Sequence, residues 1–209
     1  MKNKNEKAVK IYDQIAEDYA KTYDPIDNEG DLIFPSTFLS YLKPGSFIVD
    51  LGCGTGFSAG YFMSKGMKVE GADLSSGMIN IAKRNYPDIK FSIADMRKFK
   101  PEIKTDAVWA GYSVFHFEQS DFEKTLKTVK TYLKPQGILG IVVQEGEGEI
   151  EIPEPFLPNE KIYLHLYTEQ ELRMFLDRFG FEVIETKRKL PKNPKEFTYN
   201  KLLLIARNV

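Results

Sequence analysis

A chain of 209 residues is long enough to form one domain with a substantial buried core. Its 42% apolar content, 13% aromatic content and net charge of −1 are typical of a globular protein and argue against a nucleic-acid-binding face. The single cysteine, Cys53, excludes an internal disulfide and a cysteine metal cage. No apolar run has the length of a membrane span and the amino end has no apolar signal segment, so we expect a cytoplasmic protein with no membrane partner.

Two helices are predicted at the amino end of the chain. Residues 6–23 form one amphipathic helix, or two short ones, because apolar side chains recur there at helical spacing. This inward aromatic stripe consists of Tyr12, Ile15, Tyr19 and Tyr23. Turn residues follow at 27–30, and a second helix is expected over 34–42.

Residues 46–56 hold the motif on which the functional prediction depends. An apolar run that ends at Leu51 predicts a buried parallel strand. Gly52, Gly54 and Gly56 follow, and a backbone without Cβ can take positive φ and come close to a ligand. A helix is expected over 57–65, with its free N–H groups facing that ligand.

The spacing of these glycines separates two ligand classes. A dinucleotide site requires G-x-G-x-x-G, and its third glycine would fall at the position of Phe57. The string VDLGCGTG, residues 49–56, instead resembles the first motif of class I S-adenosylmethionine-dependent methyltransferases, whose glycine turn supports the methionine end of the cofactor. Asp50 beside the turn suits an ammonium and sulfonium ligand and would repel a pyrophosphate. The alternative is a tight turn in another kind of α/β protein.

A second resemblance concerns the first helix. The segment IYDQIAEDYAKTYD is similar to the stretch that precedes the glycine motif in many small-molecule methyltransferases, where it folds over the cofactor pocket. The resemblance therefore implies that residues 1–45 form a helical lid. An aromatic stripe docked on the core is an equally good interpretation, and the two are compatible.

The next two predicted strands also end in carboxylates. Residues 67–73 form the second strand, and Asp73 lies where α/β nucleoside binders place an acid on the ribose hydroxyls. Its alternative role is to cap helix 76–85. Residues 89–94 form the third strand and lead to Asp95, which the resemblance implies accepts from the adenine amino group. Ligands of open α/β sheets bind at such strand ends.

The fourth strand and its end, residues 105–112, resemble the family's fourth motif, in which a backbone carbonyl holds the amino group of the cofactor. The cofactor contacts expected from these strand ends and from the resemblance are Tyr19, Asp50, Gly52, Cys53, Gly54, Asp73, Leu74, Met78, Asp95, Met96, Ala110 and Tyr112. Many relatives carry two adjacent histidines after this strand, whereas here His116 is followed by Phe117. A structural role for His116 therefore competes with a role as base, and no metal site is expected.

The second half of the chain completes the pattern of alternating strands and helices. Helix 119–133 leads to strand 138–143 through the turn K-P-Q-G, in which Gln136 replaces a glycine of the family's K-P-G-G. A capping box at Thr168 opens a helix that runs to Phe179. Two further strands, 181–188 and 197–206, end the chain.

Residues 144–167 form a long connection that a minimal cofactor-binding domain does not need. The segment is rich in glutamate and interrupted by prolines. Long irregular connections in compact domains are often functional. We expect a substrate flap that presents Tyr163, His165 or Tyr167 to the pocket. An exposed acidic loop with one edge strand is the alternative.

The sequence thus predicts a single α/β domain over 1–209, a doubly wound Rossmann-like sheet of seven strands that is mostly parallel with the last strand antiparallel. The implied activity is methyl transfer from S-adenosylmethionine to a nitrogen, oxygen or carbon nucleophile of a small molecule, by a monomer or homodimer. Candidate catalytic residues are Tyr12, Tyr19, His116 and His165. A cofactor-binding regulatory module without turnover and a nicotinamide-dependent oxidoreductase are the rival interpretations.

Overall fold

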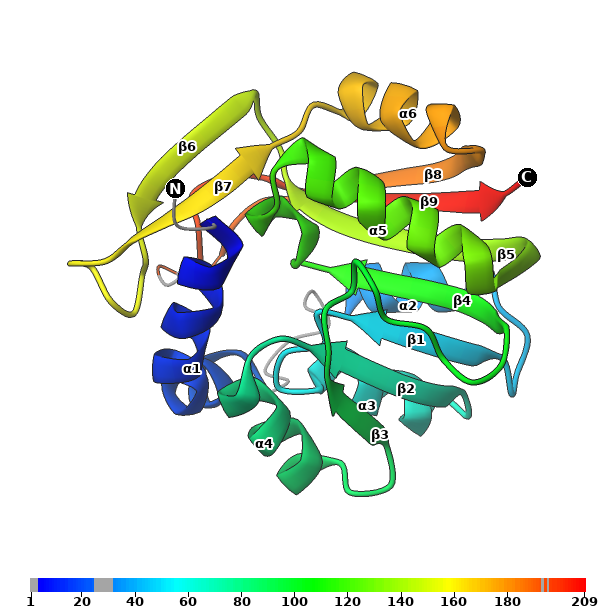
Figure 1. The fold of residues 1–209 in the computed structure, drawn as a ribbon, viewed down its shortest axis with the longest axis horizontal. Helices are drawn as coiled ribbons and strands as arrows, with labels where there is room; N and C mark the ends of the chain where they lie inside the picture. Colours follow the sequence, from blue (N-terminus) through cyan, green and yellow to red (C-terminus); the bar gives the residue numbers. More distant parts are fainter. Residues whose placement is uncertain (1–3, 25–31, 193, 195) are drawn as a thin grey trace.

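The computed structural model describes residues 4–24, 32–192, 194 and 196–209. The turn expected at 27–30 lies outside the described residues. Within them, strands and helices alternate along most of the chain, as Figure 1 shows. No described helix is both long enough and apolar enough to cross a bilayer.

A seven-stranded sheet forms the centre of the molecule, with the strand order β3-β2-β1-β4-β5-β9-β8. Its strands are β1 (Phe47–Leu51), β2 (Lys68–Asp73), β3 (Lys90–Ile93), β4 (Thr105–Gly111), β5 (Leu133–Gln144), β8 (Phe181–Lys189) and β9 (Lys201–Asn208). The first five pair in parallel, and β9 lies antiparallel between β5 and β8. This confirms the predicted doubly wound sheet with an antiparallel last strand.

Helices cover both faces of this sheet. The helices are α1 (Lys4–Tyr23), α2 (Ile33–Leu39), α3 (Phe57–Ser64), α4 (Ser76–Asn85), α5 (Gln119–Tyr132) and α6 (Glu169–Arg178), with a short 3-10 turn η2 (Val114–His116). Helices α5 and α6 pack on one face, and α2 and α3 pack on the other (Figure 1). The helix α1 lies instead beside the edge where the parallel strands end.

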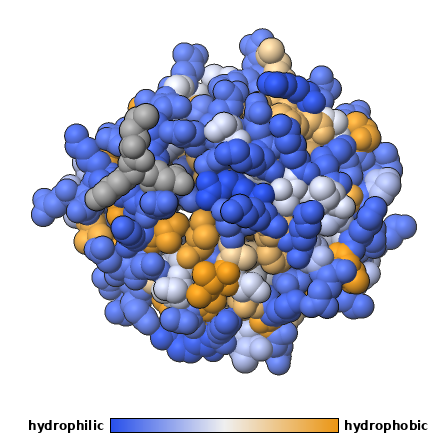
Figure 2. All heavy atoms as spheres, in the orientation of Figure 1, coloured by the Kyte–Doolittle hydropathy of each residue, from blue (hydrophilic) through white to orange (hydrophobic). Residues whose placement is uncertain are grey.

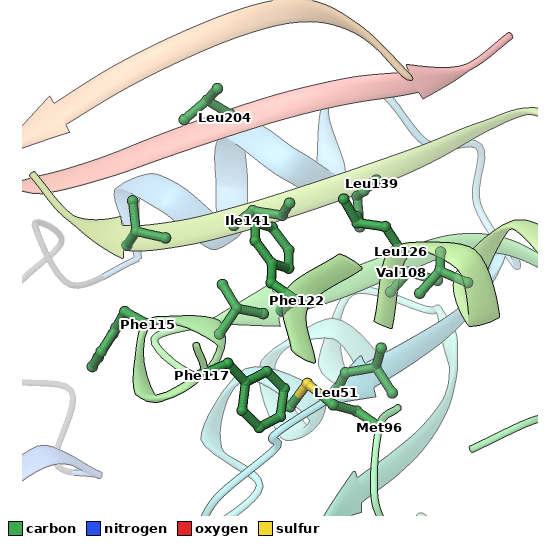
Figure 3. Close-up of a cluster of buried hydrophobic side chains, with 14 of the residues drawn as sticks. Leu51, Met96, Val108, Phe115, Phe117, Phe122, Leu126, Leu139, Ile141 and Leu204 are labelled. Carbon is green, nitrogen blue, oxygen red and sulfur yellow. The ribbon is translucent and has the colours of Figure 1, made fainter. Parts of the chain in front are cut away.

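Apolar spacing in the sequence explains both faces of the core. Phe122 and Leu126 lie one turn apart on α5, so both point toward Ile141 and its neighbours on the sheet (Figure 3). On the opposite face, the ring of Phe38 lies 5.0 Å from that of Trp109 and 5.5 Å from that of Phe62. The two layers hold the carboxyl ends of the strands in fixed positions.

The strand β5 begins earlier than the sequence predicts, at Leu133 rather than 138. Its pairing with β4 shifts register, because Thr105 pairs with Leu133 whereas Ala107 pairs with Ile138. Gln136 lies in this irregular stretch with φ of 63°, the left-handed conformation that a glycine adopts more readily. The glycine that Gln136 replaces in the resembled turn therefore corresponds to a real backbone requirement.

A separate two-stranded sheet stands beside the main one. The strands β6 (Gly148–Pro153) and β7 (Lys161–Leu166) pair antiparallel, so 144–167 is mostly a regular hairpin rather than an irregular connection. The acidic strand β6 was not predicted. Tyr163, His165 and Tyr167 are only 4%, 7% and 1% exposed. Figure 1 shows the hairpin beside the amino end of α1.

Candidate functional site

A cavity of about 530 Å³ lies where the parallel strands end. Its floor comes from the residues that follow β1, β2 and β4, and α1 forms a wall. The described residues of α1 that line it are Asn5, Ala8, Val9, Tyr12, Tyr19, Thr22 and Tyr23. Figure 2 shows the molecule from the side seen in Figure 1. Most of this surface is hydrophilic, and apolar residues gather where α1 and α4 approach the sheet in Figure 1.

The glycine turn after β1 gives the cavity a floor of bare backbone. Gly52, Gly54 and Gly56 have φ of 69°, 52° and 83°, which side chains other than glycine rarely adopt. A Cβ on Gly52 would lie 2.3 Å from Cβ of Ser113, so this glycine permits close packing against the end of β4. A Cβ on Gly54 would meet nothing within 4 Å. The backbone at Gly54 therefore faces open space.

Asp73 ties the end of β2 to this turn. Its carboxylate accepts from the N–H of Gly54 at 2.9 Å and from the N–H of Ser75 at 2.8 Å. The cap of α4 is Ser75, whose hydroxyl accepts from the N–H of Met78 at 3.1 Å. The capping role considered for Asp73 thus belongs to its neighbour, and Asp73 lines the cavity.

Two further carboxyl groups lie near the turn. Asp50 is 2% exposed, and its Oδ2 has no hydrogen-bond partner among the described residues. Burial, together with the charge of Asp73, raises the pKa of Asp50 to about 8. Asp24 accepts from the hydroxyl of Thr55 at 2.7 Å, and burial raises its pKa as well. A cationic ligand in the cavity would favour the charged form of each group.

Tyr12 and His116 meet across the cavity from distant parts of the chain. The phenol oxygen of Tyr12 lies 2.9 Å from Nε2 of His116, and both residues line the cavity. On the other side of the ring, Nδ1 of His116 lies 3.1 Å from the carbonyl oxygen of Tyr163 on β7. The pair therefore joins α1, η2 and the hairpin at one point.

The helix α1 is also held against α4. Asp13 Oδ1 accepts from the N–H of Gly77 at 2.8 Å and from the hydroxyl of Ser75 at 2.7 Å. One turn further along, Glu17 forms a two-pronged pair with Arg84 at 2.9 and 3.1 Å. The same helix thus covers the cavity and contacts the loop that carries Asp73.

Comparison with known proteins adds to this geometry. The sequence model of the methyltransferase domain family matches residues 48–137, which run from β1 through the glycine turn to the start of β5. Less than half of the 209-residue chain matches this model, and the match supports a class I S-adenosylmethionine-dependent methyltransferase.

Curated relatives and solved structures of this methyltransferase family resemble the chain at moderate distance. A ubiquinone/menaquinone biosynthesis C-methyltransferase of Campylobacter jejuni is 27% identical over 152 residues, 66% of this chain and 64% of that protein. A trans-aconitate 2-methyltransferase of Escherichia coli is 31% identical over 107 residues, 50% of this chain and 42% of that protein. The chain thus spans less than two thirds of the length of these relatives.

The fold extends beyond the matched segment. The crystal structure of 1,6-didemethyltoxoflavin-N1-methyltransferase of Burkholderia thailandensis superposes with a TM-score of 0.74 at 18% identity and covers 100% of this chain and 91% of that one. A methyltransferase of Methanosarcina mazei gives a TM-score of 0.72 at 20% identity, covering 81% of this chain and 95% of that one. The hairpin and the terminal strands therefore lie within a known methyltransferase architecture.

Most of the predicted cofactor contacts come together at the cavity of this methyltransferase fold. Those that line it are Tyr19, Asp50, Gly52, Cys53, Gly54, Asp73, Leu74, Met78, Met96 and Tyr112. Ala110 is 3% exposed and does not line the cavity, whereas the next residue, Gly111, does. The backbone that reaches the cavity at the end of β4 is thus that of Gly111, one residue after the expected Ala110.

Asp95 differs from the expectation more strongly. Its carboxylate binds the guanidinium of Arg97, with Nε at 2.8 and 3.0 Å from the two oxygens. Arg97 also pairs with Asp121 on α5 at 2.6 Å. Asp95 lies outside the cavity lining, while its neighbours Ala94 and Met96 form part of it. In this structure Asp95 therefore faces Arg97 rather than the cavity, unlike the orientation expected for contact with an adenine amino group.

The face of β7 that was expected to present side chains to the pocket does not line the cavity either. Tyr163, His165 and Tyr167 are not among the described residues that line the cavity. The ring of His165 stacks on Tyr167 at 4.2 Å, and its Nε2 lies 3.6 Å from Glu171. The hairpin instead contributes the residues that follow β6 to the cavity, namely Glu154, Pro155 and Phe156.

Six lining residues were not singled out from the sequence, namely Asp24, Thr55, Gln144, Glu154, Glu196 and Lys201. Asp24 and Thr55 lie within the two resembled segments, but no role was assigned to them. Among the other four, only Glu154 lies in a stretch with a signal, since prolines there marked an unusual connection. In the described part of the chain, no cluster of three or more histidine, cysteine, aspartate or glutamate residues is arranged to hold a metal ion.

Proposed function

We propose that this chain transfers a methyl group from S-adenosylmethionine to a small-molecule acceptor. The observation that carries the proposal is the glycine turn after β1, which opens into the cavity and is tied to Asp73 by the hydrogen bond from Gly54. The family match over 48–137 supports it. So do the relatives, which are named as a ubiquinone/menaquinone biosynthesis C-methyltransferase and a trans-aconitate 2-methyltransferase.

The residues of the cavity fit an adenosyl sulfonium. Asp73 keeps lone pairs beyond those that accept from Gly54 and Ser75, so it can accept from ribose hydroxyls. Leu74, Met78 and Met96 supply apolar contacts for a base. The unpartnered oxygen of Asp50 suits an ammonium group nearby, because burial strengthens attraction between opposite charges.

The chain itself contributes binding, orientation and exclusion of water. S-adenosylmethionine, when bound, supplies a methyl group as an electrophile and keeps the bonding electron pair on its sulfur. Displacement at that methyl requires the acceptor in line with the leaving sulfur. Holding two partners in such a geometry is worth roughly 7–11 kcal/mol in favourable cases. The position of α1 over the cavity supports this role, since a wall of tyrosines restricts water.

Direct binding separates this proposal from an oxidoreductase. S-adenosylhomocysteine at ~100 times its dissociation constant is expected to stabilise the fold by about 2.7 kcal/mol. NAD and NADP are expected to give no stabilisation, because Phe57 occupies the position of the third dinucleotide glycine and lines the cavity. Stabilisation by a nicotinamide cofactor with none by S-adenosylhomocysteine would overturn the proposal.

Turnover separates it from a regulatory module. Incubation with S-adenosylmethionine labelled in its methyl group, and with a panel of amines, phenols, N–H heterocycles and acids, is expected to yield a labelled product together with S-adenosylhomocysteine. Cofactor binding without transfer to any member of a broad panel would favour the regulatory module.

A further inference from the structure

The hydrogen bonds around His116 determine which nitrogen carries a proton. The carbonyl oxygen of Tyr163 can only accept, so Nδ1 of His116, at 3.1 Å, must be the donor. The other nitrogen, Nε2, then presents a lone pair in the neutral ring. It must accept from the hydroxyl of Tyr12 at 2.9 Å. The lone pairs of the Tyr12 oxygen therefore remain available to a donor in the cavity.

The surroundings keep this arrangement neutral in the absence of substrate. His116 is 5% exposed, and burial lowers its pKa to about 4, while the bond to the Tyr163 carbonyl acts in the opposite direction. Burial raises the pKa of Tyr12 well above its ordinary value. The titratable groups whose charges act on the pKa of Tyr12 are Tyr19, Glu154, Tyr23 and Asp73. The two carboxylates among them stabilise a positive charge that forms nearby.

We propose that the acceptor is a neutral O–H or N–H nucleophile whose proton passes through Tyr12 to Nε2 of His116. This inference rests on the proposed methyltransferase function and assigns Tyr12 as the residue that contacts the acceptor. His116 acts through Tyr12 as a positioning and proton-accepting residue. Tyr163 fixes the tautomer through its backbone, so its side chain has no part in the relay.

The step balances in atoms and charge. A lone pair of the acceptor X–H forms the X–CH3 bond, and the bonding pair of the former methyl–sulfur bond remains on sulfur. The proton of X–H moves to the oxygen of Tyr12, whose own proton moves to Nε2 of His116. One positive charge thus leaves the sulfonium and one appears on the imidazolium. The proton returns to water through Tyr12 when product leaves.

The same geometry disfavours two other classes of acceptor. A carboxylate has no proton to donate, so its lone pairs would face those of the Tyr12 oxygen. Asp73 and Glu154, which line the cavity and whose charges act on Tyr12, would also repel it. A tertiary amine likewise lacks a donor for Tyr12. The cavity thus favours phenols, N–H heterocycles and primary or secondary amines.

A matched panel tests the class of acceptor and the relay together. Phenol, indole, imidazole and benzylamine represent X–H acceptors, and benzoate and N,N-dimethylaniline represent those without a suitable proton. Turnover is expected within the first group. Tyr12→Phe and His116→Gln are each expected to lower kcat for these acceptors by about 10²–10⁴-fold. Thiophenolate is an anion and is disfavoured for the same reason as a carboxylate, and since it has no proton to pass on, Tyr12→Phe should not lower its rate.

Tyr132→Phe is the matched control, because it also removes a buried hydroxyl. The Tyr132 hydroxyl has no hydrogen-bond partner among the described residues, and Tyr132 does not line the cavity. Its kcat should equal that of the parent. The proposal is overturned by turnover confined to benzoate or dimethylaniline, by an unchanged kcat for an X–H acceptor in Tyr12→Phe, or by no X–H turnover in a protein that binds S-adenosylhomocysteine.

Nitrogen NMR gives a readout that needs no substrate. The chain has two histidines, so His165→Gln assigns the imidazole signals of His116. At neutral pH, Nδ1 should carry the proton and Nε2 should be unprotonated, and Tyr12→Phe should shift the Nε2 signal. Protonated Nε2 would overturn the relay while leaving cofactor binding, and with it the proposed function, untouched.

Discussion

Asp73 and Gly54 are joined by a hydrogen bond of 2.9 Å between a carboxylate oxygen and a backbone N–H. The acid that is expected to hold the cofactor therefore also fixes the shape of the turn that cradles it. A second bond, from the N–H of Ser75 at 2.8 Å, extends this link to the start of α4. Binding and fold stability are consequently coupled at Asp73.

Asp73→Ala is expected to weaken both properties. The free energy of unfolding without ligand should fall by about 1–3 kcal/mol, because two N–H groups lose their acceptor. The stabilisation of about 2.7 kcal/mol by S-adenosylhomocysteine at ~100 times the parent dissociation constant should largely disappear. Urea unfolding with and without ligand measures both terms.

Asp106→Ala provides the control for this experiment. Asp106 also accepts from a backbone N–H, that of Phe47 at 2.9 Å, and it pairs with Lys134 at 2.6 Å, but it does not line the cavity. Asp106→Ala should lower the free energy of unfolding by a similar amount, about 1–3 kcal/mol. The stabilisation by S-adenosylhomocysteine should remain that of the parent. If Asp73→Ala kept the parent's ligand stabilisation, the assignment of Asp73 to the ribose would be wrong.

Two glycines of the turn should respond differently to alanine. A Cβ on Gly52 would approach Ser113 at 2.3 Å and Met96 at 3.1 Å, so Gly52→Ala should destabilise the fold itself. Gly54→Ala meets nothing within 4 Å, and its cost is limited to the positive φ, about 1–2 kcal/mol. Its Cβ would occupy cavity space, so the protein should fold but lose ligand affinity. Equal affinity in Gly54→Ala and the parent would contradict a backbone cradle there.

The sequence predicted those parts of the site that depend on neighbours in the chain. The glycine turn and Asp73 follow directly from strand ends whose positions local patterns define. The orientation of Asp95 has a long-range cause, since Arg97 holds it while pairing with Asp121 on α5. No spacing rule connects those two elements.

The same distinction explains the hairpin and the proton relay. Alternation in 162–167 correctly indicated an extended strand, but the face that was expected to line the cavity packs on other elements: the Tyr167 ring lies 5.9 Å from that of Phe122 on α5, and Nζ of Lys4 on α1 lies 4.2 Å from the Tyr163 ring. Tyr12 and His116 were each candidates, yet their bond joins residues 104 positions apart. Such pairs depend on how α1 docks, which tertiary packing decides.

The docking of α1 can be tested at Asp13. Asp13→Ala removes acceptors for the Ser75 hydroxyl and the Gly77 N–H at the start of α4. Hydrogen exchange in α1 should accelerate, and ligand affinity should fall about 5–30-fold, because one or two hydrogen bonds to a charged group are lost. Arg84→Ala breaks an exposed pair with Glu17 on the same helix and should change affinity very little. Equal effects of both variants would argue against a specific contact at Asp13.

Asp50 predicts how stability depends on pH. Its pKa is raised to about 8, first by burial and then by Asp73, against about 3.9 in an unfolded chain. The folded state therefore holds the proton to higher pH than the unfolded state does. The resulting stabilisation is complete below about pH 4 and is lost as pH rises through about 8. Raised pKa values at Asp73 and Asp24 act in the same direction.

Below about pH 6.5 the lowered pKa of His116 acts in the opposite direction, because the unfolded chain then binds the extra proton. Urea unfolding from about pH 6.5 to 8 should therefore show the ligand-free protein losing stability as pH rises, and Asp50→Asn should lose less because amide side chains do not titrate. A cationic ligand favours the carboxylate, so binding should release a proton and affinity should increase up to about pH 8. Calorimetry in two buffers with different protonation enthalpies measures that release. If the parent and Asp50→Asn had identical pH profiles and identical proton release, Asp50 would already be ionised in the free protein. Its unpartnered oxygen would then attract a cationic ligand at every pH of this interval, and the raised pKa would be contradicted.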